Sequence, residues 1–224
     1  MTDTVADDHD DLPDRKAAAA ALNRLSHALV RHRADPRVLQ AIARESDRLA
    51  ANIESEPVRE RRMELLSHPS FDAAVDGSLG DLVHEDGAFV DSFSDSPVSG
   101  SANPLSIGLR IAREGQESVG KVTLQPGWQG APGRAHGGVV AAVIDDVLGA
   151  ILPIVGTMAF TGELTVRYTA PCPLGEELTF RARVAGQEGR KLYLECDGTD
   201  ASGVVFAKAT STFITIDLEQ FKQG

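Results

Sequence analysis

The sequence predicts an α+β fold in which an antiparallel sheet wraps around one central helix. Two observations predict this fold. Residues 136–152 form one apolar stretch, with Ala, Val, Ile and Leu on nearly every side of a helix, which is typical of a buried helix. Runs in which apolar and polar residues alternate, as they do in half-buried strands, lie before and after this stretch. Strands on both sides of a single buried helix indicate a sheet that covers it.

A helical extension is predicted at residues 15–70, after an acidic tail at residues 1–14 that we expect to be flexible. Leu22, Leu25 and Leu29 fall on one face of this extension at helical spacing. An amphipathic helix needs a partner surface for its apolar stripe. Packing on the following domain or on a second copy of the chain is favoured, and a module that binds a dedicated partner protein is the alternative.

A connecting segment and loop are expected at residues 71–106, because residues 91–106 are rich in Ser, Pro, Asp, Gly and Asn and have weak periodicity. The sheet-and-helix domain is predicted at residues 107–218. Its strands are predicted at residues 107–113, 118–124, 159–168, 177–186, 191–197 and 204–216. The order of elements is therefore two strands, one buried helix and four strands.

Composition and charge argue against several classes of protein. Hydrophobic residues make up 42% of the 224 residues, as in globular proteins with a buried core. No apolar run approaches the roughly 20 residues that span a bilayer, so no membrane span is expected. The formal net charge is -11 and no basic cluster occurs, which argues against nucleic-acid binding. Cys172 and Cys196 lie in apolar or strand-like sequence that favours buried thiols over a disulfide, and the acidic first residues are not a secretory signal, so we expect a cytoplasmic protein.

The residues around His136 carry the strongest functional signal. Gly137 and Gly138 follow His136 at the start of the predicted helix, where glycine is costly unless the backbone must approach another group closely. The first turn of a helix also has unpaired N–H donors at the positive end of its dipole. Such donors suit a carbonyl oxygen that gains negative charge. The alternative is that the two glycines only allow the helix to pack tightly on the sheet.

Asp145 favours the functional interpretation, because burying a carboxylate in an apolar helix is costly unless something uses it, as a general base or nucleophile would. Gly138 and Asp145 share a helix face but lie about 10 Å apart along the axis. One helix therefore cannot bring both to a single carbonyl. Two antiparallel helices of a dimer can, with Gly137 of one chain facing Asp145 of the other, so we expect a homodimer or dimer of dimers with shared active sites.

Residues 130–138, with the sequence Gly-Ala-Pro-Gly-Arg-Ala-His-Gly-Gly, resemble PaaI-like and THEM-type hotdog-fold acyl-CoA thioesterases, as do Asp145 and residues 161–168. The resemblance covers residues 107–217. It implies a hotdog fold, an antiparallel sheet wrapped around a central helix. It also implies an enzyme that hydrolyses the thioester of an acyl- or aryl-CoA to the free acid and CoA. No metal site and no separate cofactor are expected, because CoA is part of the substrate.

The same resemblance implies roles for individual residues. Asp145 would be the catalytic carboxylate, acting as base toward water or as nucleophile toward the thioester. The Gly137 amide would polarise the thioester carbonyl, and His136 would support its loop. Thr161 falls where the family places a Ser or Thr that orients the water or the carboxylate.

Four residues are candidates for binding the substrate. Gly138 and Arg134 lie beside the predicted oxyanion site. Arg190 and Lys191 lie at a turn between two strands, and similar turns in hotdog proteins meet the nucleotide phosphates of CoA, with which two adjacent cations can pair. The alternative for this turn is an exposed hairpin whose charges are solvated.

Two other functions are compatible with the same residues. A non-catalytic acyl-CoA sensor would bind the ligand and transmit a signal through the N-terminal helices, but it would have no need of Asp145. Enoyl-CoA hydration is less favoured, because the Asp–His pair of hydratases is arranged differently in the sequence. The acyl group of the substrate is not fixed by these residues.

Overall fold

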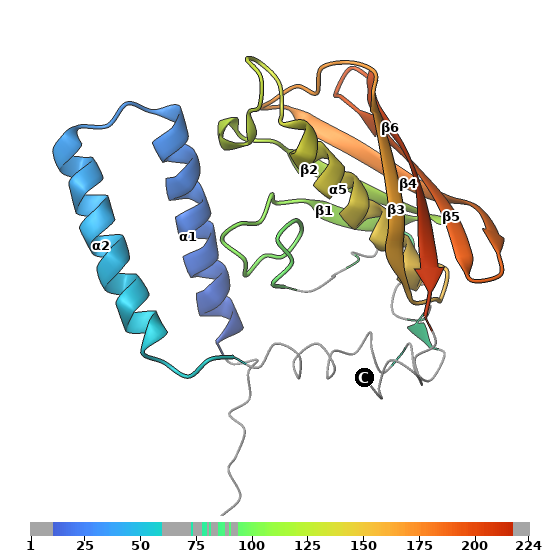
Figure 1. Cartoon of the computed structure of the whole chain (residues 1–224), viewed down its shortest axis with the longest axis horizontal. Coiled ribbons are helices and arrows are strands. Elements are labelled where there is room, and N and C mark those ends of the chain that lie inside the picture. The colour runs from blue at the N-terminus through green and yellow to red at the C-terminus, as the bar shows by residue number, and fades with distance from the viewer. Residues whose placement is uncertain are drawn as a thin grey trace, which may run out of the picture.

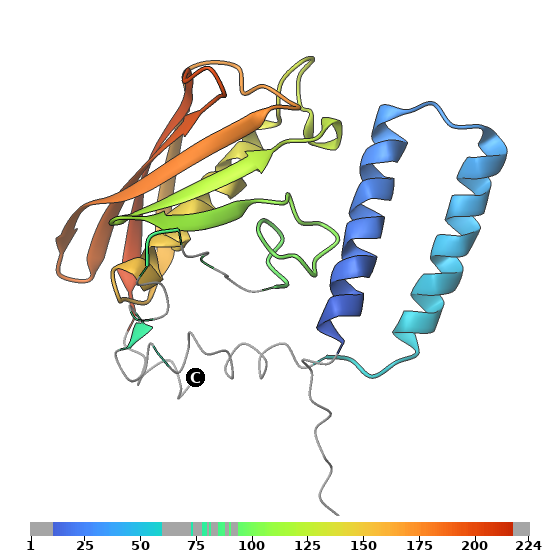
Figure 2. The same cartoon turned by 180° about the vertical axis from the view of Figure 1, so that it is seen from behind.

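The protein is described by a computed structural model that covers residues 11–59, 73, 78–79, 81, 85–87, 90 and 94–216. Within these residues a six-stranded antiparallel sheet curves around one central helix, and a helical hairpin stands to one side of this domain (Figures 1 and 2). The α+β architecture predicted from the sequence is confirmed.

The hairpin consists of α1 (Leu12–Arg31) and α2 (Pro36–Glu54). The Asp35 carboxylate caps α2 by accepting a hydrogen bond of 2.7 Å from the Arg37 N–H. Pro36 fits the first helical position, because the N–H that it lacks would have no partner there. Local sequence therefore sets where α2 begins.

The acidic tail predicted at residues 1–14 is in part helical, because α1 begins at Leu12. Pro13 at the helix start and Asp14 in the first turn both favour this earlier beginning. Residues 1–10 of that tail and residues 60–70 of the predicted extension lie outside the described residues.

The six strands follow the predicted order. They are β1 (Arg110–Glu114), β2 (Glu117–Thr123), β3 (Ala159–Tyr168), β4 (Glu177–Glu188), β5 (Lys191–Thr199) and β6 (Val205–Thr215). Their order across the sheet is β1-β2-β4-β5-β6-β3, and every neighbouring pair is antiparallel. The long strand β3, which follows the central helix, therefore forms one edge of the sheet.

The central helix is divided into α5 (Gly137–Gly149) and α6 (Ile151–Ile154), where the sequence predicted one helix over residues 136–152. Pro153 has no N–H with which to continue the helical hydrogen bonds, which explains the interruption. On length and composition alone, Gly137–Ile154 is apolar enough to cross a membrane, with a mean hydropathy of 1.9. Contacts with four strands account for this composition, because the buried residues of α5 belong to the core under the sheet.

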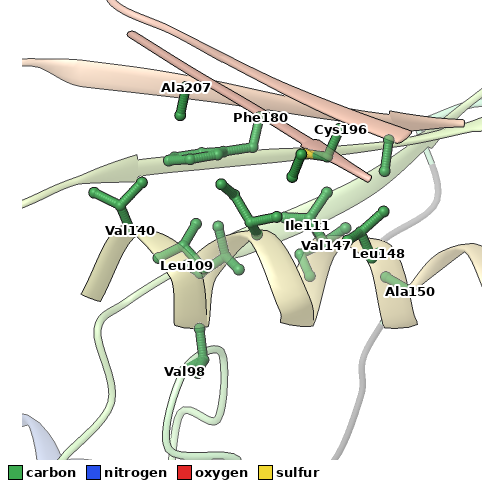
Figure 3. Close-up of a cluster of buried hydrophobic side chains, with 14 of the residues drawn as sticks. Val98, Leu109, Ile111, Val140, Val147, Leu148, Ala150, Phe180, Cys196 and Ala207 are labelled. Atoms are coloured by element: carbon green, nitrogen blue, oxygen red, sulfur yellow. The ribbon is translucent and has the colours of Figure 1, made fainter. Parts of the chain in front are cut away.

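The core lies between α5 and the concave face of the sheet (Figure 3). Val140 and Val147 of α5 are fully buried there, as are Phe180 and Phe206, whose rings meet edge to face at 5.6 Å. Cys172 and Cys196 are free and buried, as predicted. Burial raises the pKa of each thiol to about 12.

Candidate active site

His136 caps the N-terminus of α5. Its ring Nδ1 accepts a hydrogen bond of 3.0 Å from the Gly138 N–H. Its backbone N–H donates a hydrogen bond of 2.8 Å to the Trp128 carbonyl. Trp128 belongs to η2 (Pro126–Trp128), a short 3-10 helix that precedes the site. The amide of Gly138, which the sequence placed among the substrate contacts, is therefore occupied by the cap.

Gly137 is the first residue of α5, and its N–H donates no hydrogen bond to any described residue. Its carbonyl accepts a hydrogen bond of 2.6 Å from the Tyr168 hydroxyl, which lies at the end of β3. Burial raises the pKa of Tyr168. Tyr168 thus ties the edge strand to the helix start. The sequence gives no signal of this contact, because Tyr168 is an aromatic residue in a strand, 31 positions after Gly137.

Asp145 lies on a flank of α5 beside β3, where the Thr161 hydroxyl donates a hydrogen bond of 3.0 Å to its Oδ1. The sequence predicted that this carboxylate is buried in an apolar helix, but in the single chain it is half-buried and Thr161 is exposed. The edge position of β3 explains the difference, because no further strand covers this flank. The structure therefore brings the carboxylate and the predicted hydroxyl together at a surface.

Two groups of predicted residues lie on the same helix but apart from each other. His136 and Gly137 lie at its N-terminus, and Asp145 lies about two turns further on. At 1.5 Å per residue, Gly137 and Asp145 are about 12 Å apart along the axis. A reacting carbonyl must lie about 3 Å from both the donor and the base. A single chain therefore carries both the donor and the carboxylate, but too far apart for both to contact one carbonyl group.

The segment that holds these residues is similar to a known protein family. Residues 132–207 match the sequence model of the thioesterase superfamily, a segment that includes His136, Gly137, Asp145 and Thr161. The segment that carries the candidate site therefore has the sequence pattern of a thioesterase-superfamily domain.

Relatives of this thioesterase domain carry acyl-CoA thioesterase names. Acyl-coenzyme A thioesterase THEM4 of Bos taurus is 33% identical over 96 residues, which are 42% of this chain and 39% of that protein. THEM5 of Mus musculus is 32% identical over 102 residues, 44% of this chain and 41% of that protein. The matched segment therefore spans about two fifths of the length of these relatives.

One solved structure matches far more of the chain. The crystal structure of a thioesterase superfamily protein superposes with a TM-score of 0.71 and 28% sequence identity, covering 89% of this chain and 90% of that one. So large a share extends beyond the sheet-and-helix domain. The likeness in fold therefore includes part of the chain that precedes the thioesterase domain.

Burial raises the pKa of Asp146, the neighbour of the predicted catalytic carboxylate. The charge of Asp145 raises this pKa further, while the hydroxyls of Ser99 and Ser96 lower it. Ser96 and Ser99 belong to the loop at residues 94–106, so the Asp146 carboxyl faces this loop. The sequence analysis assigned no role to this residue, because spacing does not show which of two adjacent carboxylates faces a loop.

The predicted cations lie in two places. Arg134 is exposed on the loop before His136, close to the helix start. Arg190 and Lys191 are exposed on the β4–β5 hairpin, which Figure 1 shows far from the N-terminus of α5. Arg190 Nε already donates to the Thr215 carbonyl at 3.0 Å. Within one chain the hairpin cations are therefore not part of the helix-start cluster. Among the described residues, no three His, Cys, Asp or Glu side chains are grouped so that they could hold a metal ion.

Proposed function

We propose that this protein is an acyl-CoA thioesterase, which hydrolyses an acyl- or aryl-CoA to the free acid and CoA. One observation carries the proposal: α5 begins with the Gly137 amide, which has no hydrogen-bond partner among the described residues. The same helix bears a carboxylate, Asp145, that the Thr161 hydroxyl orients. An oxyanion donor and an oriented carboxylate are the two groups that acyl transfer to water needs. The acyl-CoA thioesterase names of the relatives support the same reaction.

In the proposed reaction the Gly137 N–H donates to the thioester carbonyl oxygen and stabilises the negative charge that develops on it. Asp145 then acts in one of two ways. As a base it accepts a proton from water while the water oxygen bonds to the carbonyl carbon. As a nucleophile it bonds to that carbon itself, and water later cleaves the resulting anhydride. In both cases the C–S bond breaks, the CoA thiolate leaves and takes up a proton, and the acid is released.

We propose that each active site is shared by two chains. The separation of about 12 Å between Gly137 and Asp145 leaves each half-site incomplete in one chain. A two-fold axis that places α5 beside its copy, in antiparallel orientation, brings Gly137 of one chain to Asp145 of the other. The exposed edge strand β3, which carries Thr161 and Tyr168, lies on the side where the copy would pack. A homodimer is the minimal unit, and a dimer of dimers contains the same pair.

The cations are proposed to bind the CoA phosphates, Arg134 from the loop beside the helix start and Arg190 and Lys191 from the hairpin. Guanidinium and ammonium groups pair with phosphate through charge-assisted hydrogen bonds. The distance between these two places in one chain is compatible with contributions from different chains to one substrate. Replacing both Arg190 and Lys191 with Ala would then raise KM for the CoA thioester with little change in kcat.

The direct test is the release of free thiol from a panel of acyl-CoAs of short, medium and long chain and with aryl groups. Wild type is compared with Asp145→Ala and with the isosteric Asp145→Asn, and circular dichroism checks that each variant is folded. Loss of a general base or nucleophile is expected to lower turnover by about 10²–10⁴-fold. Near-normal turnover by Asp145→Ala would overturn the mechanism. Saturable binding without turnover by wild type on every substrate would indicate the acyl-CoA sensor instead.

A further inference from the structure

Residues of α1 at four-residue spacing contact the loop at residues 94–106 and the thioesterase domain. Arg15 forms an ion pair with Asp95, and Asn23 donates to the carbonyls of Pro104 and Ser106 at 3.1 and 2.8 Å. The rings of His27 and Trp128 pack edge to face, with 5.5 Å between their centroids.

Ala19 is the only buried apolar residue among those described in α1, and Leu22, Leu25 and Leu29 are exposed. The buried apolar area that usually holds a helix in place is therefore small here. Specific polar and ring contacts fix the position of α1.

The contact of His27 leads directly to the active site. Its neighbours Gly127 and Trp128 form η2, and the Trp128 carbonyl accepts the His136 N–H at 2.8 Å. His136 in turn accepts the Gly138 N–H at 3.0 Å and caps α5. An unbroken series of contacts thus runs from the N-terminal helix to the turn that presents the Gly137 amide.

Two close approaches show how tightly this series is packed. A Cβ on Gly127 would lie 2.3 Å from His27 Nδ1, and a Cβ on Gly130 would lie 2.8 Å from His136 Cα. Any other residue at position 127 would displace the His27 ring, and any other residue at position 130 would meet the His136 backbone.

The contact between His27 and Trp128 is also kept at a cost in free energy. His27 Nδ1 and Trp128 Nε1 are both buried without a hydrogen-bond partner in the part of the chain that the structure describes. A buried polar atom without a partner is rare in folded proteins, and it calls for an explanation in terms of function or strain.

We propose that His27 is a positioning residue, and that helix α1 acts through Trp128 to hold the loop before α5 where its first amide can reach the thioester carbonyl. The inference rests on the proposed function. It gives the N-terminal helix a part in catalysis, although it lies outside the segment that matches the thioesterase superfamily. Since the Gly137 amide acts on the charge that develops in the transition state, a displaced loop lowers kcat more than it changes KM.

Trp128 is the only tryptophan in the chain, so its fluorescence reports directly on this contact. In His27→Ala the ring contact is lost, and we expect a red-shifted Trp128 emission and a kcat lowered by about tenfold, since small displacements of a catalytic group have effects of this order or larger. His27→Phe restores an aromatic edge and is expected to recover both the emission and most of kcat. His32→Ala, which changes an exposed histidine at the end of the same helix, serves as the matched control and is expected to match wild type.

A second variant tests the contact without changing His27. Gly127→Ala places a methyl group against His27 Nδ1 and is expected to reproduce both effects, whereas in the His27→Ala background the same change has little further effect. This double-mutant cycle identifies coupling through the contact, because independent effects would add.

The proposed thioesterase function and the positioning role of His27 are contradicted by different results. If wild type hydrolyses no acyl-CoA, the proposed function fails, and the inference falls with it even if the fluorescence cycle shows the predicted coupling. If wild type is active and His27→Ala shifts the emission while kcat stays unchanged, the proposed function stands and the positioning role is overturned. Additive effects of Gly127→Ala and His27→Ala would overturn it as well.

Discussion

The thioesterase domain and the N-terminal hairpin are held in place by different forces. In the domain, α5 buries five residues against the sheet, and side chains as large as Phe180 and Phe206 are fully enclosed. In the hairpin, no described residue of α2 is buried, and α1 buries only Ala19. The domain is thus stabilised by apolar area, and the hairpin is positioned by a few specific contacts. The contrast fits the proposed positioning role of α1, because the domain maintains the fold by itself while α1 contacts the loop before α5 through few residues.

The largest effect on stability is expected at the centre of the domain. Phe180→Ala removes a fully buried ring that meets Phe206 edge to face, and the cavity and lost burial should lower the free energy of unfolding by about 3–5 kcal/mol. Denaturant unfolding measures this change. A cost below about 1 kcal/mol would mean that the core does not hold the domain as described.

A change at the helix start should affect catalysis while leaving the core intact. Gly137→Pro removes one N–H at a helical position that tolerates proline, and His136 before it already has the extended backbone that proline requires. We expect turnover to fall by about 10²–10³-fold, as for other lost oxyanion donors.

Gly137→Ala is the matched control for this variant. It places the same Cβ 3.2 Å from the Tyr168 hydroxyl but keeps the N–H. Equal turnover in the two variants would show that crowding, and not the amide, is responsible.

A smaller effect is expected from the buried carboxyl next to Asp145. Because burial raises the pKa of Asp146 above its ordinary value of 3.8, the native state holds this proton longer than the unfolded state does. Its contribution to stability is therefore complete below pH 3.8 and is lost as the pH rises through the native pKa. Asp146→Asn keeps a neutral side chain at every pH and removes this loss, so at neutral pH the variant should be more stable than wild type.

Thermal unfolding across the pH range tests this prediction, with Asp47→Asn on the exposed surface of α2 as the control. If wild type and Asp146→Asn show the same dependence of stability on pH, Asp146 is not the group described.

The smallest effect is expected in the hairpin. Ile53 of α2 is 72% exposed, so Ile53→Ala should change the free energy of unfolding by no more than about 0.5 kcal/mol. Denaturant unfolding measures this value at two protein concentrations. A cost of 2 kcal/mol or more (about four times that limit) would show that α2 is covered by another chain and that the contrast between the two regions is incomplete.

The sequence predicted the fold correctly where buried residues recur at a regular spacing along a strand or helix. Alternating apolar residues predicted all six strands, and the apolar stretch after His136 predicted the central helix, because burial on one face constrains every second residue in a strand. Pro153 directly follows this stretch, but its effect on the end of the helix was missed. The grouping of His136 with Gly137 followed from their adjacency, and the role of Thr161 from resemblance to a family.

Contacts between distant segments left no such pattern. Tyr168 and Gly137 meet because β3 is the strand that runs beside the start of α5. No local pattern of apolar residues indicates the order of strands in a sheet. The same holds for His27 and Trp128, which are separated by about a hundred residues. The partial exposure of Asp145 likewise depends on which strand forms the sheet edge, and this is a property of the whole fold.

The central claim is that two chains share each active site, and mixed dimers test it most directly. Asp145→Ala and Gly137→Pro chains with different tags are co-expressed, and dimers that carry both tags are isolated and assayed for thiol release. In such a dimer one site has both intact groups and the other has neither, so the account predicts about half the wild-type turnover from two parents that are each inactive. Turnover no higher than that of the parents would show that Gly137 and Asp145 act within one chain and would contradict the account.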